Sequence, residues 1–218
     1  MNKLPVAALV LFTLPLAAFC QTEGDCSTAL SAPLHSGASL TIDSVSLGMQ
    51  IVHADPGQAQ NSAPDILRVS CTRSDHSGRV SIKLSGTADQ MRLHVTGSTA
   101  RNSNIQLRVE VPQHTNLRVH MMAGQITITE IDGDKDCDLS FGQIEITNKH
   151  KWDYRAVGAS VDIGQVNASP YNTEMGGFFR HFRATFPSGD YALHAQVGTG
   201  QIDLKGPRQR GKHGATED

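Results

Sequence analysis

The chain has 218 residues, and its 19 lysines and arginines nearly balance its 21 aspartates and glutamates, which gives a formal net charge of −2 at pH 7. This balance argues against a nucleic-acid-binding protein, because such proteins carry a concentrated basic surface. The one basic cluster begins at Lys205 and continues through Arg208, Arg210 and Lys212. We interpret residues 207–218 as a disordered basic tail, which is typical of polar chain ends.

The N-terminus has the pattern of a secretory signal peptide. Lys3 precedes an apolar run over residues 6–19, and polar residues follow from Gln21. The run of about 14 residues is too short to span a bilayer. We therefore predict that residues 1–20 are removed, that there is no transmembrane anchor, and that the protein is secreted, periplasmic or on the outer cell surface. The alternative is a lipoprotein with an acylated Cys20, although bulky Phe19 stands where a lipobox has a small residue.

Three cysteines remain after this cleavage, enough for one disulfide in an oxidising compartment. Cys71 and Cys137 lie in alternating apolar runs, and Cys26 lies in a stretch, residues 21–37, that we interpret as an N-terminal loop segment. We predict a Cys26–Cys71 disulfide, and the other two pairings stay open. No cysteine or histidine pair has zinc spacing, so no metal site is predicted.

After residue 37, apolar and polar residues alternate with period 2, which predicts half-buried strands. The alternating segments are 40–42, 45–52, 66–71, 80–84, 91–95, 105–111 and 117–120. Turn-forming residues separate them, as at 54–57 and 112–116. Helix signals are nearly absent, so the sequence predicts an all-β protein.

A repeated phrase favours a solenoid over a sandwich. Gly-Gln and an aliphatic residue recur at separations of 18, 22 and 36 residues, beginning at Gly124, Gly142, Gly164 and Gly200. We interpret each repeat as a coil of about 18–22 residues in a single-stranded right-handed β-solenoid, or β-helix, that spans residues 38–206. The glycines would form the corners, where the backbone needs a positive φ. The gap of 36 residues leaves room for one hidden or replaced coil.

This interpretation assigns an inner and an outer row to the coils. Apolar pairs should stack inside as Ile126/Ile128, Ile144/Ile146, Val161/Ile163 and Ile202/Leu204. A competing register for the third coil starts at Gly158. An exposed amide ladder should form outside from Gln125, Gln143, Gln165 and Gln201.

Part of the chain is similar to a known family. Residues 109–119 read VEVPQHTNLRV, residues 123–128 read AGQITI, and residues 131–134 read IDGD. This pattern resembles the bacterial putative-adhesin family of secreted β-solenoid proteins, a domain of unknown function. The resemblance covers roughly residues 38–206, with Gln where the family more often has Asp, Glu or Ser. It implies a solenoid fold and a role in adhesion, without a defined ligand or reaction.

Acidic residues and histidines offer only weak candidate sites. The run from Asp132 to Asp138 has alternating carboxylates, but Cys137 and Gln143 stand where an EF-hand needs Gly and Glu. His94, His120 and His194 occupy alternating strand positions that we expect to face solvent. Asp162 and Asp203 would be the candidate acids of a glycan-cleaving groove. We predict no catalytic residue, no metal and no cofactor.

Aromatic residues crowd an insertion at about 170–190. Tyr171, Phe178, Phe179, Phe182, Phe186 and Tyr191 are six of the eleven aromatics in the chain. We expect a turn or short helix here that caps the solenoid core. The alternative is an exposed partner contact made by Phe178, Phe179 and Phe182 with Arg180 and Arg183 at its rim.

These features predict a non-catalytic secreted or cell-envelope β-solenoid that serves as an adhesion or scaffold module. Its partner would be an envelope polysaccharide or protein, and not a nucleic acid. The alternative is a glycan-binding or glycan-cleaving β-helix enzyme.

Overall fold

The computed structural model describes residues 20–54, 65–73, 80–97 and 105–206. The predicted signal peptide, except Cys20, and the basic tail lie outside these residues. The described part contains twelve strands and, apart from two short 3-10 turns, no helix, which confirms the all-β class. None of its helical segments is long and apolar enough to cross a bilayer. The turns are η2 (Lys151–Asp153) and η3 (Ser169–Tyr171).

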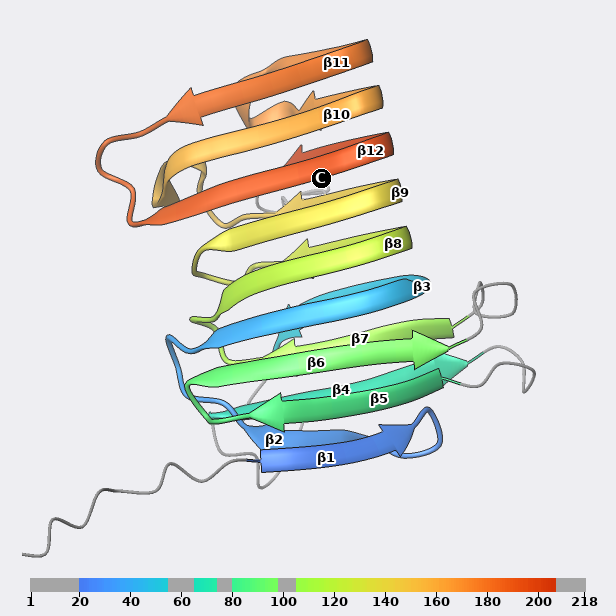
Figure 1. The fold of residues 1–218 in the computed structure, drawn as a ribbon. Helices are drawn as coiled ribbons and strands as arrows, with labels where there is room; N and C mark the ends of the chain where they lie inside the picture. Colours follow the sequence, from blue (N-terminus) through green and yellow to red (C-terminus); the bar gives the residue numbers. More distant parts are fainter. Residues whose placement is uncertain (1–19, 55–64, 74–79, 98–104, 207–218) are drawn as a thin grey trace, which may run out of the picture.

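All twelve strands belong to one mixed sheet that does not close on itself. Five long strands run parallel in the middle of the stack, in the order β3 (Ser39–His53), β8 (Asn116–Thr129), β9 (Lys135–Thr147), β12 (Tyr191–Lys205) and β10 (Tyr154–Ala168). An antiparallel edge strand, β11 (Thr173–Thr185), ends the stack at β10 (Figure 1). We call these six strands the parallel half.

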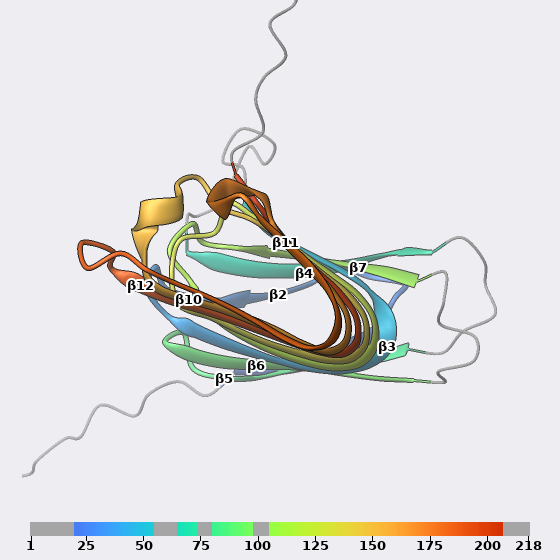
Figure 2. The same ribbon diagram turned by 90° about the horizontal axis from the view of Figure 1, so that it is seen from above.

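The long strands bend so that each has a first and a second arm facing each other across the core (Figure 2). The bend lies at one register row, in which Gly124, Gly142, Gly200 and Gly164 are neighbours on successive strands. All four have φ between 125° and 146°, a region that L side chains rarely adopt. A Cβ on Gly142 would also collide with the carbonyl oxygen of Gly124, and one on Gly200 with that of Gly142. The repeated glycine is therefore required both by conformation and by close strand stacking.

The other six strands form an antiparallel half beyond β3. The first arm of β3 continues into β6 (Gln90–Gly97), β5 (Val80–Gly86) and β1 (Cys20–Asp25). The second arm continues into β7 (Ile105–Val111), β4 (Ile66–Arg73) and β2 (Leu30–Pro33). The predicted Cys26–Cys71 disulfide is confirmed, and it joins the end of β1 to β4.

Residues 21–37 were predicted to be a loop segment, and this was wrong. They contain most of β1 and all of β2, which are the two outermost strands of the antiparallel half. Leu30, Ala32 and Leu34 alternate with exposed residues and are buried in the core. This alternation is short and is flanked by Gly and Pro residues, which are typical of turns, so the sequence pattern predicted a loop in place of the strands.

The inner rows match the predicted ladder except in the third repeat. Ile126, Ile144, Ile202 and Val166 form one buried row, and Ile128, Ile146, Leu204 and Ala168 form the next. The expected pair Val161/Ile163 belongs instead to the first arm, where Val161 is buried and Ile163 is 47% exposed. Gly164 aligns with the other bend glycines, so the register starting at Gly158 is also wrong.

The strands do not stack in sequence order, because β12 lies between β9 and β10. The coil expected in the 36-residue gap is β11, which runs antiparallel to β10 as an edge strand. The structure therefore supports an all-β bent-strand stack, and it does not by itself establish a single-stranded solenoid of successive coils.

Candidate functional site

On the outer surface of the first arm, nine strands each place one polar residue in a single register row. We call it the outer row. Its members, from one end of the stack to the other, are Glu23, Lys83, His94, Asp43, His120, Asp138, Gln196, Ser160 and His181. Every one of these residues is exposed or half-buried. Neighbouring strands lie about 4.8 Å apart, so the row presents polar groups at a regular spacing.

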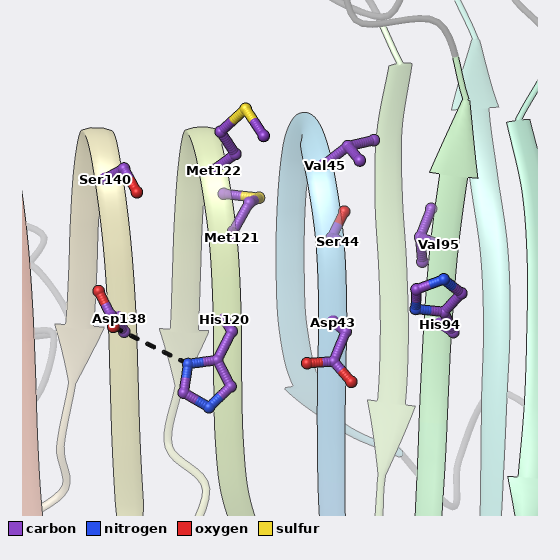
Figure 3. Close-up of a pocket in the computed structure, with 10 residues that line it drawn as sticks. All are labelled: Asp43, Ser44, Val45, His94, Val95, His120, Met121, Met122, Asp138 and Ser140. Atoms are coloured by element: carbon purple, nitrogen blue, oxygen red, sulfur yellow. Dashed lines mark ion pairs between the residues drawn. The ribbon is translucent and has the colours of Figure 1, made fainter.

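The middle of the outer row lies in a shallow hollow of about 340 Å³ (Figure 3). His94, Asp43, His120 and Asp138 alternate across β6, β3, β8 and β9. His120 Nδ1 lies 4.0 Å from Asp138 Oδ2. Next to these polar groups, the side chain of Met122 is 55% exposed. The hollow thus offers hydrogen-bonding groups beside an apolar contact.

A second row of charged groups flanks the first. Arg118 Nε lies 3.2 Å from Asp136 Oδ2, and His194 Nδ1 lies 3.2 Å from Asp136 Oδ1. Arg92 Nε lies 3.4 Å from Asp43 Oδ2, which links the two rows. These pairs are largely exposed and contribute little to stability. They place donors and acceptors next to each other on the surface.

The prediction that His94, His120 and His194 face solvent is confirmed, because all three are exposed on the first arm. The sequence did not reveal that two of them share a row with Asp43 and Asp138. The positions of these histidines in the alternating runs predicted that their side chains point to solvent. Which residues become neighbours depends on strand pairing, and residues 43 and 138 are far apart in the chain.

The acidic run at residues 132–138 is a turn followed by the start of β9. Its side chains alternate, so Asp136 and Asp138 face outward while Lys135 and Cys137 are buried. Within the part of the chain that the structure describes, no group of three His, Cys, Asp or Glu side chains is placed to hold a metal ion.

A second hollow, also about 340 Å³, lies where the turns before β9, β10 and β12 meet. Trp152 is 55% exposed there, and its ring stacks on His150 with centroids 5.1 Å apart and planes 4° apart. Asp132, Asp153 and Asp190 line the same hollow. An exposed aromatic ring beside carboxylates provides a stacking surface and hydrogen-bond acceptors for a polar ligand.

The glutamines of the second arm do not form the predicted amide ladder. Gln143 donates to Asp203 Oδ2 over 2.6 Å, and Gln201 donates to both oxygens of the same carboxylate. Gln165 donates to Glu174 over 2.6 Å, and Gln125 alone is exposed. The amides pair with carboxylates because Asp203 and Glu174 lie in the next row on the same face of the sheet, two positions along the strands, which the repeat itself did not reveal.

The carboxylates proposed for a cleaving groove do not meet. Asp162 is exposed on the first arm, whereas Asp203 is 4% exposed on the second arm, where it accepts hydrogen bonds from the glutamines. The two acids therefore belong to different faces, and this pairing is wrong.

The aromatic insertion contains one buried and two strongly exposed phenylalanines. Phe182 is 7% exposed and contacts Tyr171, with ring centroids 5.1 Å apart, so it covers the end of the core. Phe178 and Phe179 are 66% and 71% exposed. Arg180 and Arg183 are exposed on the same strand. Phe182 therefore does not belong to a surface contact, and the segment is a strand instead of a turn or short helix.

A buried lysine lies at the start of β9. Lys135 Nζ donates to the carbonyl oxygen of Ile131 over 2.6 Å and to the hydroxyl of Tyr154. Burial lowers the pKa of Lys135 to about 8. Burial raises the pKa of neighbouring Cys137 to about 12, and it also raises the pKa of Tyr154. These groups form a polar interior contact that is not accessible to a ligand.

No protein-family model matches the sequence, and comparison with curated proteins finds no similar sequence. Among solved structures, the chain is similar to a crystal structure described as a putative cell adhesion protein from Clostridium sporogenes. The two share 11% sequence identity with a TM-score of 0.47, and the match covers 83% of this chain and 99% of that chain. A likeness at this level carries no inference about function.

Proposed function

We propose that this protein is a non-catalytic, exported adhesion or scaffold module that binds an extended envelope polysaccharide across its outer row. The observation that carries the proposal is the outer row itself, in which nine strands each place one polar side chain on the same face. A polymer with regularly spaced hydroxyl groups lying across the strands would meet donors and acceptors at a regular spacing.

Three further features support this proposal. The signal-peptide pattern and the Cys26–Cys71 disulfide fit an oxidising compartment outside the cytosol. The resemblance of residues 38–206 to secreted β-solenoid adhesins fits the parallel bent strands, which we interpret as a short solenoid joined to an antiparallel end. The hollow in the row is shallow, as expected for a chain ligand that crosses the surface.

The test is binding of the purified mature chain to a glycan array and to polysaccharide extracted from the native envelope. The double variant His120→Ala/Asp138→Ala should weaken binding at least ten-fold, because it removes two adjacent members of the outer row. The matched control is Gln125→Ala, since Gln125 is exposed on the second arm. Equal binding by both variants would show that the outer row is not the binding surface.

The alternative is a glycan-cleaving enzyme, which the spacing of two carboxylates in the outer row favours. Asp43 and Asp138 lie in the outer row on strands separated only by β8. Their backbones are therefore about 10 Å apart, close to the carboxyl separation of inverting glycosidases. Release of reducing ends from a bound polysaccharide, abolished by Asp138→Asn, would favour this alternative.

A further inference from the structure

The edge strand β11 leaves one side of the sheet open at the end of the parallel half. It is the last strand in the sheet order, and among the described strands it pairs only with β10 (Figure 1). A 13-residue edge strand is a template for pairing with another chain. Its two largest exposed apolar side chains, Phe178 and Phe179, are next to each other at the middle of the strand.

The bend determines how a second copy would fit on this edge. On β10, Val161 and Val166 are both buried although they are five residues apart, so the inward and outward positions exchange midway between them, next to the bend glycine Gly164. Their partners on β11 are Arg180 and Met175, so the midpoint of the bend of β11 lies between residues 177 and 178. Suppose that β11 of a second copy stacks antiparallel on β11 with the two bends aligned. A two-fold axis then passes through the bend, and the first arm of one copy lies on the second arm of the other. Residues equally distant from the bend then face each other across the axis.

The sequence on the two sides of this bend places an aromatic ring opposite an open glycine. Across the axis, Phe178 faces Gly177 of the second copy, and Phe179 faces Gly176. Gly176 has only one heavy atom within 4 Å of an added Cβ, the carbonyl oxygen of Gly164 at 3.6 Å, so its outer side is open. The ring of Phe179 therefore meets an open position in the second copy. The ring of Phe178 meets the guanidinium of Arg180, which in each copy lies over Gly177, 2.9 Å from the position of an added Cβ.

The charges on β11 are compatible with the same register. Glu174 faces His181 of the second copy, and both residues lie at outward positions, because their partners in β10 are Asn167 and Ser160. Arg180 faces Met175 and not another cation. The register therefore creates two Glu174–His181 contacts and no directly facing pair of like charges.

From this edge we propose that a second copy of the chain pairs antiparallel with β11, so that the two sheets join end to end. The joined assembly buries Phe178 and Phe179 and removes the open edge. Because the two-fold axis exchanges the arms, the outer rows of the two copies lie on opposite sides of the assembly. Such a dimer can hold two polymer chains, one on each side.

The first experiment is sedimentation equilibrium of the mature chain, which we expect to show a dimer at micromolar concentrations. Phe179→Asp and Gly176→Gln should each raise the dimer dissociation constant at least ten-fold, the first by charging the edge and the second by filling the space that receives Phe179. Thermal melts should show both variants folded, since both positions are exposed. The matched control is Phe141→Ser, which removes an exposed ring on β9 and should leave the dimer intact.

The second experiment tests the register in the mature chain, whose one unpaired cysteine, Cys137, is buried. A Glu174→Cys chain mixed with a His181→Cys chain should form a disulfide-linked dimer under oxidation, because these residues face each other across the axis. Either variant alone should link far less. A wild-type chain that stays monomeric at 100 μM, or a dimer that survives Phe179→Asp, would overturn the proposal, and neither outcome bears on polysaccharide binding.

Discussion

The parallel and antiparallel halves share one core and one sheet, and they are stabilised in different ways. In β8, β9, β12 and β10 of the parallel half, neighbouring strands carry the same Gly-Gln-aliphatic phrase, so glycine faces glycine and isoleucine faces isoleucine or valine in the adjoining row. In the antiparallel half no such repeat exists, and a disulfide joins β1 to β4. Repetition therefore supplies strand register in one region of the molecule, while a covalent bond limits opening in the other.

The largest effect should come from placing a charge in the ladder of the parallel half. Ile144→Asp puts a carboxylate where the side chain is fully buried between Ile126 and Ile202. Burying an unpaired charge costs several kcal/mol, about the whole stability of a small domain. We expect the variant to be unfolded by circular dichroism at 25 °C. A cooperative melt close to that of the wild type would show that the ladder tolerates polar groups.

Removing the disulfide should destabilise the antiparallel half. Cys26 and Cys71 are 45 residues apart in sequence, and closing a loop of this size contributes about 4 kcal/mol in the chain-entropy model. In the double variant Cys26→Ser/Cys71→Ser, hydrogen exchange should accelerate in β1, β2 and β4 more than in β8, β9 and β12. Uniform acceleration along the chain would mean that the two halves open as one unit.

Replacing a bend glycine by alanine should destabilise the fold, whereas the same change at a glycine outside the bend should not. Gly142→Ala forces a side chain into a position with φ of 135° and against the carbonyl oxygen of Gly124. We expect a loss of about 2–3 kcal/mol in the free energy of unfolding by urea denaturation. Gly158→Ala is the control, since its nearest neighbour to an added Cβ is 3.6 Å away. Equal losses in both variants would contradict the role given to the bend.

The glutamines should differ according to their partners. Gln143→Ala removes a donor to the buried carboxylate of Asp203, and the loss should be about 1 kcal/mol because Gln201 still donates to that group. Gln125 is exposed, so Gln125→Ala should change stability by less than about 0.5 kcal/mol. Thermal melts of the two variants measure the difference. A silent Gln143→Ala would indicate that solvent replaces the lost donor.

The buried lysine should give the parallel half a pH dependence. The pKa of Lys135 is about 8 in the folded protein against 10.5 in the unfolded chain, so the unfolded state binds more protons above pH 8. Lys135 therefore makes the free energy of unfolding increase with pH, by about 1 kcal/mol between pH 7 and pH 9. The melting temperature of the wild type, measured relative to that of Lys135→Met, should therefore increase from pH 7 to pH 9. A constant difference between the two proteins would mean that Lys135 keeps its charge throughout.

The sequence by itself determined features that depend on local rules. Period-2 alternation indicated the strands, and the Gly-Gln repeat marked the positions where the bend needs a positive φ, as Gly124 and Gly142 show. The cysteine count, together with the positions of Cys26 and Cys71, was enough to favour the disulfide that forms. The class of the protein and the direction in which the strand histidines face followed from the same local patterns.

Only the tertiary structure decided which strands become neighbours. The insertion of β12 between β9 and β10, and the place of β11 at the edge, result from hydrogen-bond pairing between segments far apart in the chain. The same pairing aligned Asp43 with His120 and Asp138 into the outer row and placed Asp203 beside Gln143. The alternating pattern determines on which face of a strand a side chain lies. It does not determine the order of the strands, because many orders in the sheet are compatible with the same pattern. The order is selected by the packing of the whole core, which no single segment encodes.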